Sequence, residues 1–344
     1  MKRPAKRSST GKFNKTEVLA SPTKTTSKFS RFKRQNSSLI AKENKKEYDI
    51  DEIIKNYSIL SQAGLDDNGK VKTNQDCYLE INKLYGINDA NIFGIFDGHG
   101  PNGDLVSQSV VKYLTKFYTT NPKLRIAEDS TGAYITLHRD NFDIIKKSLQ
   151  RAEKELSSNK IDASLSGSTS CIIFQLGNKL VISNVGDSRA ILVKNNEVIP
   201  LSIDQKPSDE AEKKRIEKCG GEVKQLVENG KPTGPFRVFK KGMDFPGIAM
   251  SRSVGDTYST TLGVVCEPDI KEAEIDDNAQ FIVIASDGVW EFLENKEVME
   301  IVMPYYDSND VEGACKKLVE EATKNWTENE KNVRDDITCI ILFF

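Results

Sequence analysis

The sequence has few residues that bind soft metal ions and no apolar segment long enough to span a membrane. Only two of its 344 residues are histidines, and the six cysteines are scattered with no Cys-x-x-Cys pair. This pattern argues against a zinc site and indicates reduced thiols, which we expect to be buried. The longest apolar run, Ile337 to Phe344, is far shorter than the roughly 18 residues of a membrane helix, and the start lacks a signal peptide's apolar region. We therefore expect a cytoplasmic or nuclear protein with no transmembrane segment.

Acidic and basic residues are nearly balanced overall but unevenly distributed. The formal net charge is −2, yet residues 1–46 contain 14 Lys and Arg against only Glu17 and Glu43. This stretch is rich in Ser and Thr and poor in apolar side chains, so we expect a disordered basic tail. Besides a plain solvated tail, its patches at 2–7 and 31–34 could be nuclear localisation signals, contacts with acidic partners or kinase sites. We expect no nucleic-acid binding, and a monomer.

Residues 47–344 show the alternation of a globular domain. The chain is 38% hydrophobic and 29% charged, as soluble globular proteins are. Apolar runs predict strands at Asn91–Phe96, Ser170–Leu176, Leu180–Val185, Ala190–Val193, Phe281–Ala285 and Ile337–Phe344. Amphipathic stretches predict helices at Asp104–Tyr118, Phe142–Leu156, Ser208–Lys218, Lys296–Met303 and Val311–Asn325. Short turns between neighbouring strands indicate antiparallel pairing rather than repeated βαβ units.

One predicted strand ends in an unusual group of residues. The apolar run 92–96 is followed directly by Asp97, Gly98, His99 and Gly100. This sequence places an acid and a proton-transfer group together at a strand end, which is where many proteins bind ligands. Taken alone, the Asp-Gly pair could equally be a simple turn.

Three further strands carry an aspartate at one end. Asp187 and Asp287 follow the runs 180–186 and 281–286, and Asp335 and Asp336 precede 337–344. If these ends meet, the carboxylates repel one another unless cations neutralise them. Oxygen ligands without paired cysteines favour Mg²⁺ or Mn²⁺ over Zn²⁺. A pair of such ions can activate a water and bind a phosphoryl group, although each aspartate alone also suits a turn.

Two other motifs suggest alternatives. Residues 98–103 fit G-x-G-x-x-G between a strand and a helix, so a dinucleotide-binding oxidoreductase is possible on this pattern. However, the polar segment 119–130 contains no second parallel strand with a terminal acid. Residues 66–69, Asp-Asp-Asn-Gly, are similar to part of an EF-hand loop, but Gln75 stands where the ligating glutamate belongs. We expect a hairpin turn there.

Seven segments of the chain resemble, in the same order, signature segments of the metal-dependent type 2C protein serine/threonine phosphatases (PPM family). They are FGIFDGHG (93–100), GSTSCIIF (167–174), NVGDSRAIL (184–192), AMSRSVGD (249–256), EPDI (267–270), IASDGVWEFL (284–293) and RDDIT (334–338). The resemblance spans about residues 55–344 and leaves only the tail outside. It implies an α+β fold, a four-layer αββα sandwich of two mainly antiparallel sheets, with a metal site at one end between the sheets. Residues of about 204–250 would form a flap beside the substrate groove.

The resemblance also implies the ligands of two Mg²⁺ or Mn²⁺ ions. Asp97 would bridge both ions, and the carbonyl of Gly98 would bind one of them. Asp287 and Asp335 would bind the other ion. Asp187 falls at the position of a weaker third-metal site.

The implied reaction is hydrolysis of phosphoserine and phosphothreonine in proteins. A water bridging the two ions would attack phosphorus in line, without a phosphoenzyme. His99 would act as the general acid that protonates the departing seryl or threonyl oxygen, a role suited to a group that titrates near neutrality. The alternative is a pseudophosphatase that binds partners without catalysis, but Asp97, His99, Asp287 and Asp335 are all present.

The chain departs from the family pattern near its first motif. The family commonly has an Arg before a Glu-Asp pair, the Arg for phosphate and the Glu for the second metal. Here Asp76 keeps its place, but Gln75 offers only a neutral oxygen, so we expect a weaker second-metal site. Lys72 or Lys70 is the nearest substitute for the Arg, and a lysine lacks the bidentate guanidinium. Near the third site, Glu291 stands where aspartate is frequent.

Overall fold

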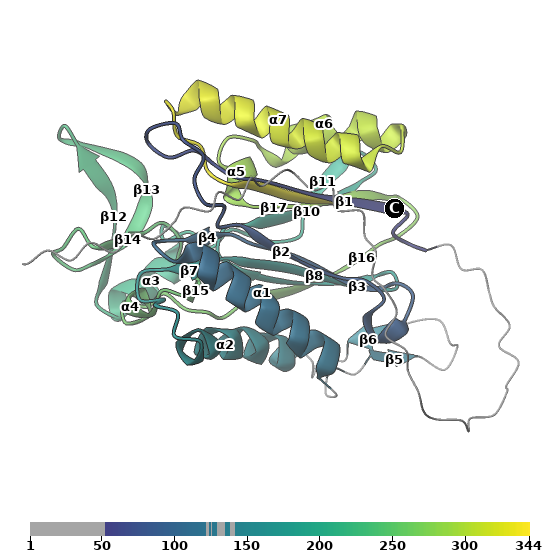
Figure 1. Cartoon of the computed structure of the whole chain (residues 1–344), viewed down its shortest axis with the longest axis horizontal. Coiled ribbons are helices and arrows are strands. Elements are labelled where there is room, and N and C mark those ends of the chain that lie inside the picture. Colours follow the sequence, from purple (N-terminus) through teal and green to yellow (C-terminus); the bar gives the residue numbers. More distant parts are fainter. Residues whose placement is uncertain (1–51, 122–123, 125, 129–134, 138–141) are drawn as a thin grey trace, which may run out of the picture. The chain divides into compact units, whose positions relative to one another are not determined.

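Two antiparallel β-sheets lie face to face at the centre of the computed structural model (Figure 1). The structure describes residues 52–121, 124, 126–128, 135–137 and 142–344. The first sheet has the order β1 (Asn56–Gln62), β18 (Ile337–Phe343), β17 (Ala279–Ala285), β10 (Arg189–Lys194) and β11 (Glu197–Pro200). The second has the order β16 (Asp269–Glu274), β9 (Lys179–Val185), β8 (Ser170–Leu176), β3 (Ala90–Phe96) and β2 (Cys77–Ile81).

The central strands are apolar throughout because both of their faces are buried. Successive side chains of a strand point to opposite faces. On β17, Ile282 and Ile284 therefore join the core between the two sheets, whereas Phe281 and Val283 join the core under the covering helices. A strand with only one buried face would instead alternate with polar residues.

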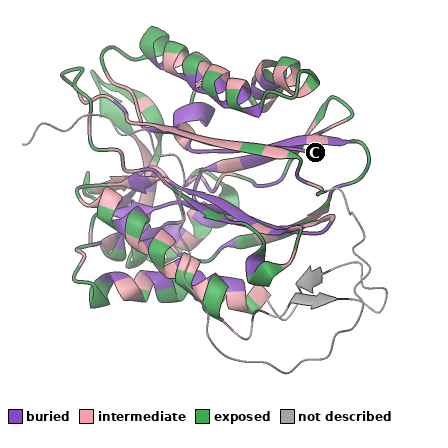
Figure 2. Ribbon diagram, turned by 45° about the vertical axis from the view of Figure 1, so that its right-hand side comes forward, coloured by how far each residue is buried: buried purple, intermediate pink, exposed green. Residues whose placement is uncertain are grey.

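Two pairs of helices cover the outer faces and complete the four layers that we predicted. α1 (Gly103–Thr120) and α2 (Phe142–Ser158) share a core with β3 and β8, and α6 (Asn295–Asp307) and α7 (Val311–Asn329) share one with β17 and β18. The predicted apolar face of α7 is buried: Val311, Ala314, Cys315, Leu318, Val319 and Ala322. Figure 2 shows the central strands buried and the outer faces of these helices exposed. Across the described residues, no helix is both long and apolar enough to cross a membrane.

Short elements lie around the ends of the two main sheets. β4 (Gly98–His99), β7 (Gly167–Ser168) and β15 (Val254–Gly255) form a small three-stranded sheet, and β5 (Ile126–Glu128) pairs with β6 (Ile135–Leu137). The remaining short helices are η1 (Leu84–Gly86), α4 (Thr257–Thr260) and α5 (Asp287–Trp290).

The segment expected to form the flap has its own small sheet. After α3 (Glu210–Lys218), the strands β12 (Gly221–Glu228), β13 (Lys231–Lys240) and β14 (Pro246–Ile248) pair in this order. The β12–β13 hairpin projects away from the main sheets (Figure 1). The base of this segment has a separate apolar core that includes Ile216, Val223, Val238 and Ile248.

The structure agrees with most of the predicted elements and corrects others. All six predicted strands and five predicted helices are present, with ends shifted by a few residues. The sequence prediction omitted β1, β2 and β16 and the strands of the flap, which are more polar. The expectation that all cysteines are buried was wrong, because Cys219 is exposed and Cys77 is half-buried. The predicted disordered tail, residues 1–46, lies outside the described residues.

The fold contradicts the dinucleotide-binding and EF-hand alternatives. β3 pairs antiparallel with both of its neighbours, β2 and β8, whereas a dinucleotide-binding unit needs a parallel neighbour. Residues 66–69 form the predicted hairpin turn, in which the Asp66 carboxylate accepts hydrogen bonds from the backbone nitrogens of Asn68 and Lys70.

A buried carboxylate connects α3 to the segment that follows the flap. The side chain of Glu212 is only 8% exposed. It accepts hydrogen bonds from both terminal nitrogens of Arg215, from Arg252 and from the Ser251 hydroxyl at 2.6 Å. Burial alone would raise the pKa of Glu212, but these donors outweigh it and lower the pKa to about 2. The ionised form is therefore part of the folded structure.

We expect Glu212→Gln to lower the free energy of unfolding by about 3 kcal/mol at neutral pH, because it leaves two arginines without their anion. The pKa of Glu212 is lowered on folding from 4.5 to about 2, so its stabilisation is complete above pH 4.5 and is lost as the pH falls toward 2. Urea denaturation at pH 7 and pH 3 should show the difference between wild type and variant shrinking at pH 3. Glu210→Gln, which affects an exposed pair with Lys214, is the matched control and should change little. A difference independent of pH would contradict this assignment.

Candidate active site

Asp97 lies in a group of aspartates that come from five separate segments; Asp76 and Asp187 are buried, and the other three are half-buried. Burial raises its pKa well above the usual value, and repulsion from the carboxylates of Asp287, Asp76, Asp335 and Asp187 raises it further. Repulsion of this size requires the carboxylates to be close in space and poorly solvated. The structure therefore brings together the aspartates at the ends of four predicted strands and adds Asp76, which precedes β2.

Two more members of this group are held in unfavourable surroundings. Burial raises the pKa of Asp287 well above its usual value, and repulsion from Asp335 and Asp187 adds to the effect. Burial also raises the pKa of Asp76 to about 7, although one of its oxygens accepts a hydrogen bond from Ser286 Oγ at 2.8 Å. Without a cation, the pKa values of Asp97, Asp287 and Asp76 therefore lie above the usual range of a carboxylic acid.

Lys72 lies against the same cluster. Its Nζ is 2.6 Å from Asp335 Oδ1 and 3.0 Å from Asp336 Oδ2. Burial alone would lower the pKa of Lys72, but these two carboxylates raise it above the usual value. Asp336 also accepts hydrogen bonds from the backbone nitrogens of Gly64 and Gln75. Asp336 therefore fixes the chain around the site, while Lys72 neutralises part of its charge.

A second lysine occupies the other side of the group. Lys206 Nζ donates to Asp187 Oδ2 at 2.6 Å, and the Asp187 side chain is only 3% exposed. Burial alone would lower the pKa of Lys206, but Asp187 raises it. Lys206 thus binds Asp187, the carboxylate at the position that the family resemblance implies for a third metal ion.

The chemistry of the cluster suits a hard divalent cation. Three of its buried oxygens have no hydrogen-bond partner within the described part of the chain, namely Oδ1 of Asp76, Asp187 and Asp287. A buried anionic oxygen without a partner is costly unless a cation binds it, and carboxylate oxygens suit Mg²⁺ or Mn²⁺. Among the residues described, no three acidic, histidine or cysteine groups are yet arranged around one point.

The remaining predicted ligands lie around the same end of the sandwich. Gln75 Nε2 donates to the carbonyl of Gly100 at 2.8 Å, so the amide nitrogen is bonded within the fold. Gly98 lies in β4, and its nitrogen donates to the Gln75 carbonyl. Lys70 is exposed in the turn after β1, and Glu291 is exposed directly after α5.

His99 follows the cluster on β4 and pairs with an aspartate. Its Nε2 is 2.6 Å from Asp256 Oδ2. Burial alone would lower the pKa of His99, but Asp256 raises it, with smaller contributions from Asp187 and Asp335. The imidazole therefore lies near the carboxylates that could hold metal ions.

The sequence prediction missed two residues of this site. Asp256 is the last residue of the motif at 249–256, and Lys206 lies in a Lys-Pro pair before α3. Neither position shows which side chain it contacts until the fold is known, because Asp256 is 157 positions from His99. The sequence pointed to these residues only because each lies in a segment that resembles the family.

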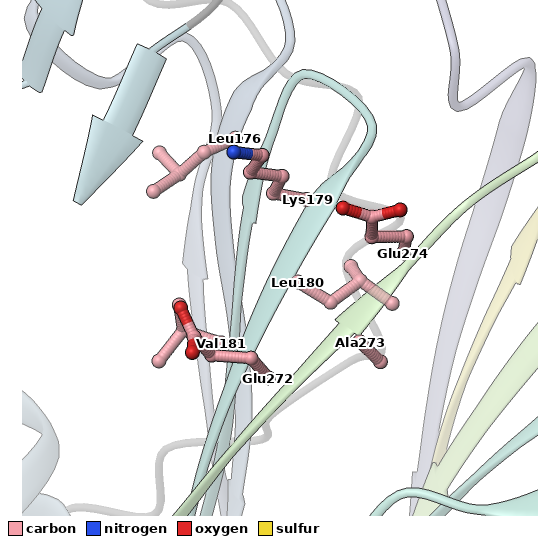
Figure 3. A pocket seen from close by; sticks show the side chains of 7 residues that line it. All are labelled: Leu176, Lys179, Leu180, Val181, Glu272, Ala273 and Glu274. Atoms are coloured by element: carbon pink, nitrogen blue, oxygen red, sulfur yellow. The ribbon is translucent and has the colours of Figure 1, made fainter. Parts of the chain in front are cut away.

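A pocket elsewhere on the protein contains none of these residues. Figure 3 shows it at the turn between β8 and β9 and beside β16, with Lys179, Glu272 and Glu274 around an apolar base. It lies at the start of β9, whereas Asp187 follows the end of that strand. We assign the candidate active site to the aspartate cluster because its carboxylates and the nearby His99 are suited to cation binding and proton transfer.

Comparisons with known proteins agree with this assignment. The family described as protein phosphatase 2C matches residues 67–331. "Probable protein phosphatase 2C 35" of Arabidopsis thaliana is 34% identical over 305 residues, which cover 83% of this chain and 83% of that protein. "Probable protein phosphatase 2C 64" of Oryza sativa subsp. japonica is 34% identical over 285 residues, covering 80% of this chain and 63% of that protein.

The fold is also found among solved structures. The crystal structure of serine-threonine phosphatase 2C from Toxoplasma gondii superposes with a TM-score of 0.69 and 22% identity, covering 84% of this chain and 94% of that chain. This likeness supports the four-layer sandwich with its two antiparallel sheets. Together with the match over residues 67–331, it shows that the chain belongs to the protein phosphatase 2C family of metal-dependent phosphatases.

Proposed function

We propose that this chain hydrolyses phosphoserine and phosphothreonine in proteins by in-line attack of water on phosphorus, with no phosphoenzyme. The observation that carries the proposal is the buried cluster around Asp97 with the His99–Asp256 pair beside it. The cluster provides oxygen ligands for cations, and the histidine provides a proton donor within the same site. Both groups are needed to break a phosphate ester of a poor leaving group.

The aspartates would hold two Mg²⁺ or Mn²⁺ ions. In this assignment the residues that would hold them are Asp97, Asp287 and Asp335, together with the carbonyl of Gly98. When bound, the ions supply positive charge to the phosphoryl oxygens and make a water more acidic. We infer that Asp76 supports the second ion, whose site is weakened because Gln75 offers only a neutral amide oxygen where a carboxylate would add charge.

A third ion would require a rearrangement around Asp187. The free oxygen Oδ1 of Asp187 is buried and lacks a partner among the described residues, which supports a weak third site. Its other oxygen is bound to Lys206. An ion there has to share the carboxylate with an ammonium group, so we expect it to bind more weakly than the first two.

His99 would donate the proton that the departing oxygen needs. A serine or threonine alkoxide is a strong base, so it leaves only as it is protonated. Because Asp256 raises the pKa of His99, the imidazole is held toward its protonated form. The site therefore combines a proton donor with carboxylates that could bind cations.

The domain boundaries follow from the same proposal. We infer a catalytic domain over residues 47–344, whose flap, at about 204–250, borders the substrate groove and contributes to the choice of phosphoprotein. Residues 1–46 would be a basic tail outside the catalytic domain, suited by charge to acidic partners. The substrates are phosphoproteins, as in the rest of the family.

We expect the purified protein to hydrolyse p-nitrophenyl phosphate and a phosphothreonine peptide only with Mn²⁺ or Mg²⁺. Chelation by EDTA should abolish turnover, and Asp287→Ala should lower it by about 100-fold or more, since it removes a ligand of the ion. Asp277→Ala, which changes an exposed aspartate in the turn between β16 and β17, is the matched control. Turnover that persists in EDTA would refute the metal-dependent mechanism.

We expect His99→Ala to discriminate between leaving groups. p-Nitrophenolate leaves without a proton, whereas the alkoxide of threonine requires one, so the variant should lose about 100-fold in kcat on the peptide and much less on p-nitrophenyl phosphate. Steady-state kinetics with both substrates measure the two losses. Equal losses would exclude His99 as the general acid.

Lys72 has two possible roles, and its contacts favour one of them. Its ammonium group lies between two carboxylates at 2.6 and 3.0 Å, so a phosphate would have to compete for it. We infer that Lys72 is mainly an internal counter-charge for Asp335 and Asp336, and secondarily a phosphate contact. Lys70 is exposed in its turn and is the weaker candidate for that contact.

We expect Lys72→Met to bind Mn²⁺ about 10-fold more tightly, equivalent to about 1.4 kcal/mol, because no ammonium group then competes for Asp335. The metal-free variant should also unfold at a lower temperature, since two carboxylates lose their partner. Isothermal titration calorimetry and thermal denaturation measure these effects. Lys70→Met is the control and should match the wild type. Unchanged Mn²⁺ affinity with a raised KM for the peptide would instead make Lys72 the phosphate contact.

A further inference from the structure

The small sheet β4–β7–β15 brings together two residues that are far apart in the sequence. β7 is the middle strand, and Gly167 on it pairs with His99 of β4 on one side and with Gly255 of β15 on the other. Asp256 follows Gly255 directly. The histidine and the aspartate therefore meet across the middle strand, at 2.6 Å between His99 Nε2 and Asp256 Oδ2.

Glycine on the middle strand makes this contact possible. A Cβ at position 167 would lie 2.1 Å from Asp256 Oδ2 and 2.7 Å from His99 Nε2. Real Cβ atoms do not approach other heavy atoms so closely, so any side chain at Gly167 would separate the pair. The absence of a side chain at this position thus gives the imidazole and the carboxylate their shared space.

Asp256 is itself fixed by several contacts. Its Oδ2 also accepts a hydrogen bond from Ser253 Oγ at 2.7 Å, and its backbone nitrogen donates to the carbonyl of Ser166 at 2.9 Å. Its backbone is left-handed, with φ of 44°, a conformation that aspartate tolerates better than most residues. The residue is only 3% exposed. A carboxylate held this firmly is suited to orient a partner.

The contact determines how the imidazole is presented. His99 Nε2 is committed to Asp256, and Nδ1 is buried without a hydrogen-bond partner among the described residues. The nitrogen that carries the proton is set by the bond that the other nitrogen makes. Nδ1 is thus the ring nitrogen left without a partner among the described residues, and substrate binding has to give the departing oxygen access to it.

We propose that Asp256 is a positioning residue for the general acid: it holds His99 Nε2 so that Nδ1 serves the leaving group. This inference rests on the proposed role of His99. Asp256 touches neither substrate nor metal in this assignment and acts only through the imidazole. An aspartate that orients a histidine by its second nitrogen is a known way to fix a catalytic tautomer.

The first test compares two substrates in four proteins: wild type, Asp256→Asn, His99→Ala and the double variant. Asp256→Asn should lower kcat on a phosphothreonine peptide by about 30-fold or more, and on p-nitrophenyl phosphate by less than about 3-fold, as loss of acid catalysis predicts. KM and the Mn²⁺ affinity measured by calorimetry should not change. Because Asp256 acts through His99, the double variant should be no slower than His99→Ala alone.

The outcomes separate the two hypotheses. If His99→Ala lowers kcat equally on both substrates, His99 is not the general acid, and this inference fails with that role. Only the inference about Asp256 is overturned if His99→Ala lowers kcat mainly on the peptide but Asp256→Asn lowers it equally on both substrates. The same holds if the two reductions in kcat multiply in the double variant. Weakened Mn²⁺ binding in Asp256→Asn would also overturn it, since that shows a structural role in the metal site. Asp89→Asn, which alters an aspartate bonded to the Ile53 nitrogen, is the control for the substitution.

A spectroscopic test does not depend on turnover. The chain has only two histidines, so His138→Gln assigns the ¹⁵N resonances of His99 directly. With the ring neutral, the proton should be on Nε2 in the wild type and should redistribute toward Nδ1 in Asp256→Asn. If Asp256→Asn does not fold, Ser253→Ala, which removes the other donor to Asp256 Oδ2, should give a weaker loss with the same preference for the peptide. An unchanged tautomer, or a Ser253→Ala loss equal on both substrates, would refute the proposal.

Discussion

Repulsion among buried carboxylates is the constraint on which the rest of this structure depends. The raised pKa values of Asp97, Asp287 and Asp76 reflect how little water and how many like charges surround these side chains. The two sheets provide the restraint. Their central strands are buried on both faces, so the strand ends cannot move apart without exposing apolar surface. Hydrophobic packing in the sandwich thus stabilises an arrangement of charges that would be unfavourable by itself.

The protein relieves this repulsion in two ways. Lys72 and Lys206 supply permanent positive charge at the edges of the cluster, whereas three oxygens at its interior remain without partners in the described structure. The lysines reduce the cost of the metal-free state, and the unpaired oxygens retain an affinity for divalent ions. A lysine near a metal ligand therefore lowers metal affinity and raises the stability of the empty site together.

The sequence predicted the parts of the fold that follow a strong local pattern. β3, β8, β9, β17 and β18 were recognisable because strands buried on both faces are continuously apolar. β1 and β16 were missed because they carry polar and exposed positions, and the flap strands because they contain many charged residues. The aspartates of the cluster could be listed from strand ends, but their meeting depends on sheet order. The lysine contacts and the Asp256 pair depend on tertiary structure alone, and no local pattern specifies them.

The buried strand ends and the projecting β12–β13 hairpin differ in how firmly they are held. Asp97 and Asp287 lie at the ends of buried strands, which limits their motion, and His99 lies on β4, an edge strand that pairs with β7 on one side. The β12–β13 hairpin has few buried side chains beyond its base, so its position costs little to change. Ligand geometry for divalent ions tolerates errors of only a few tenths of an ångström, whereas recognition of varied phosphoproteins benefits from adjustable contacts. The contacts of Glu212 with Ser251 and Arg252 hold the base of this segment, while the β12–β13 hairpin beyond it stays largely exposed.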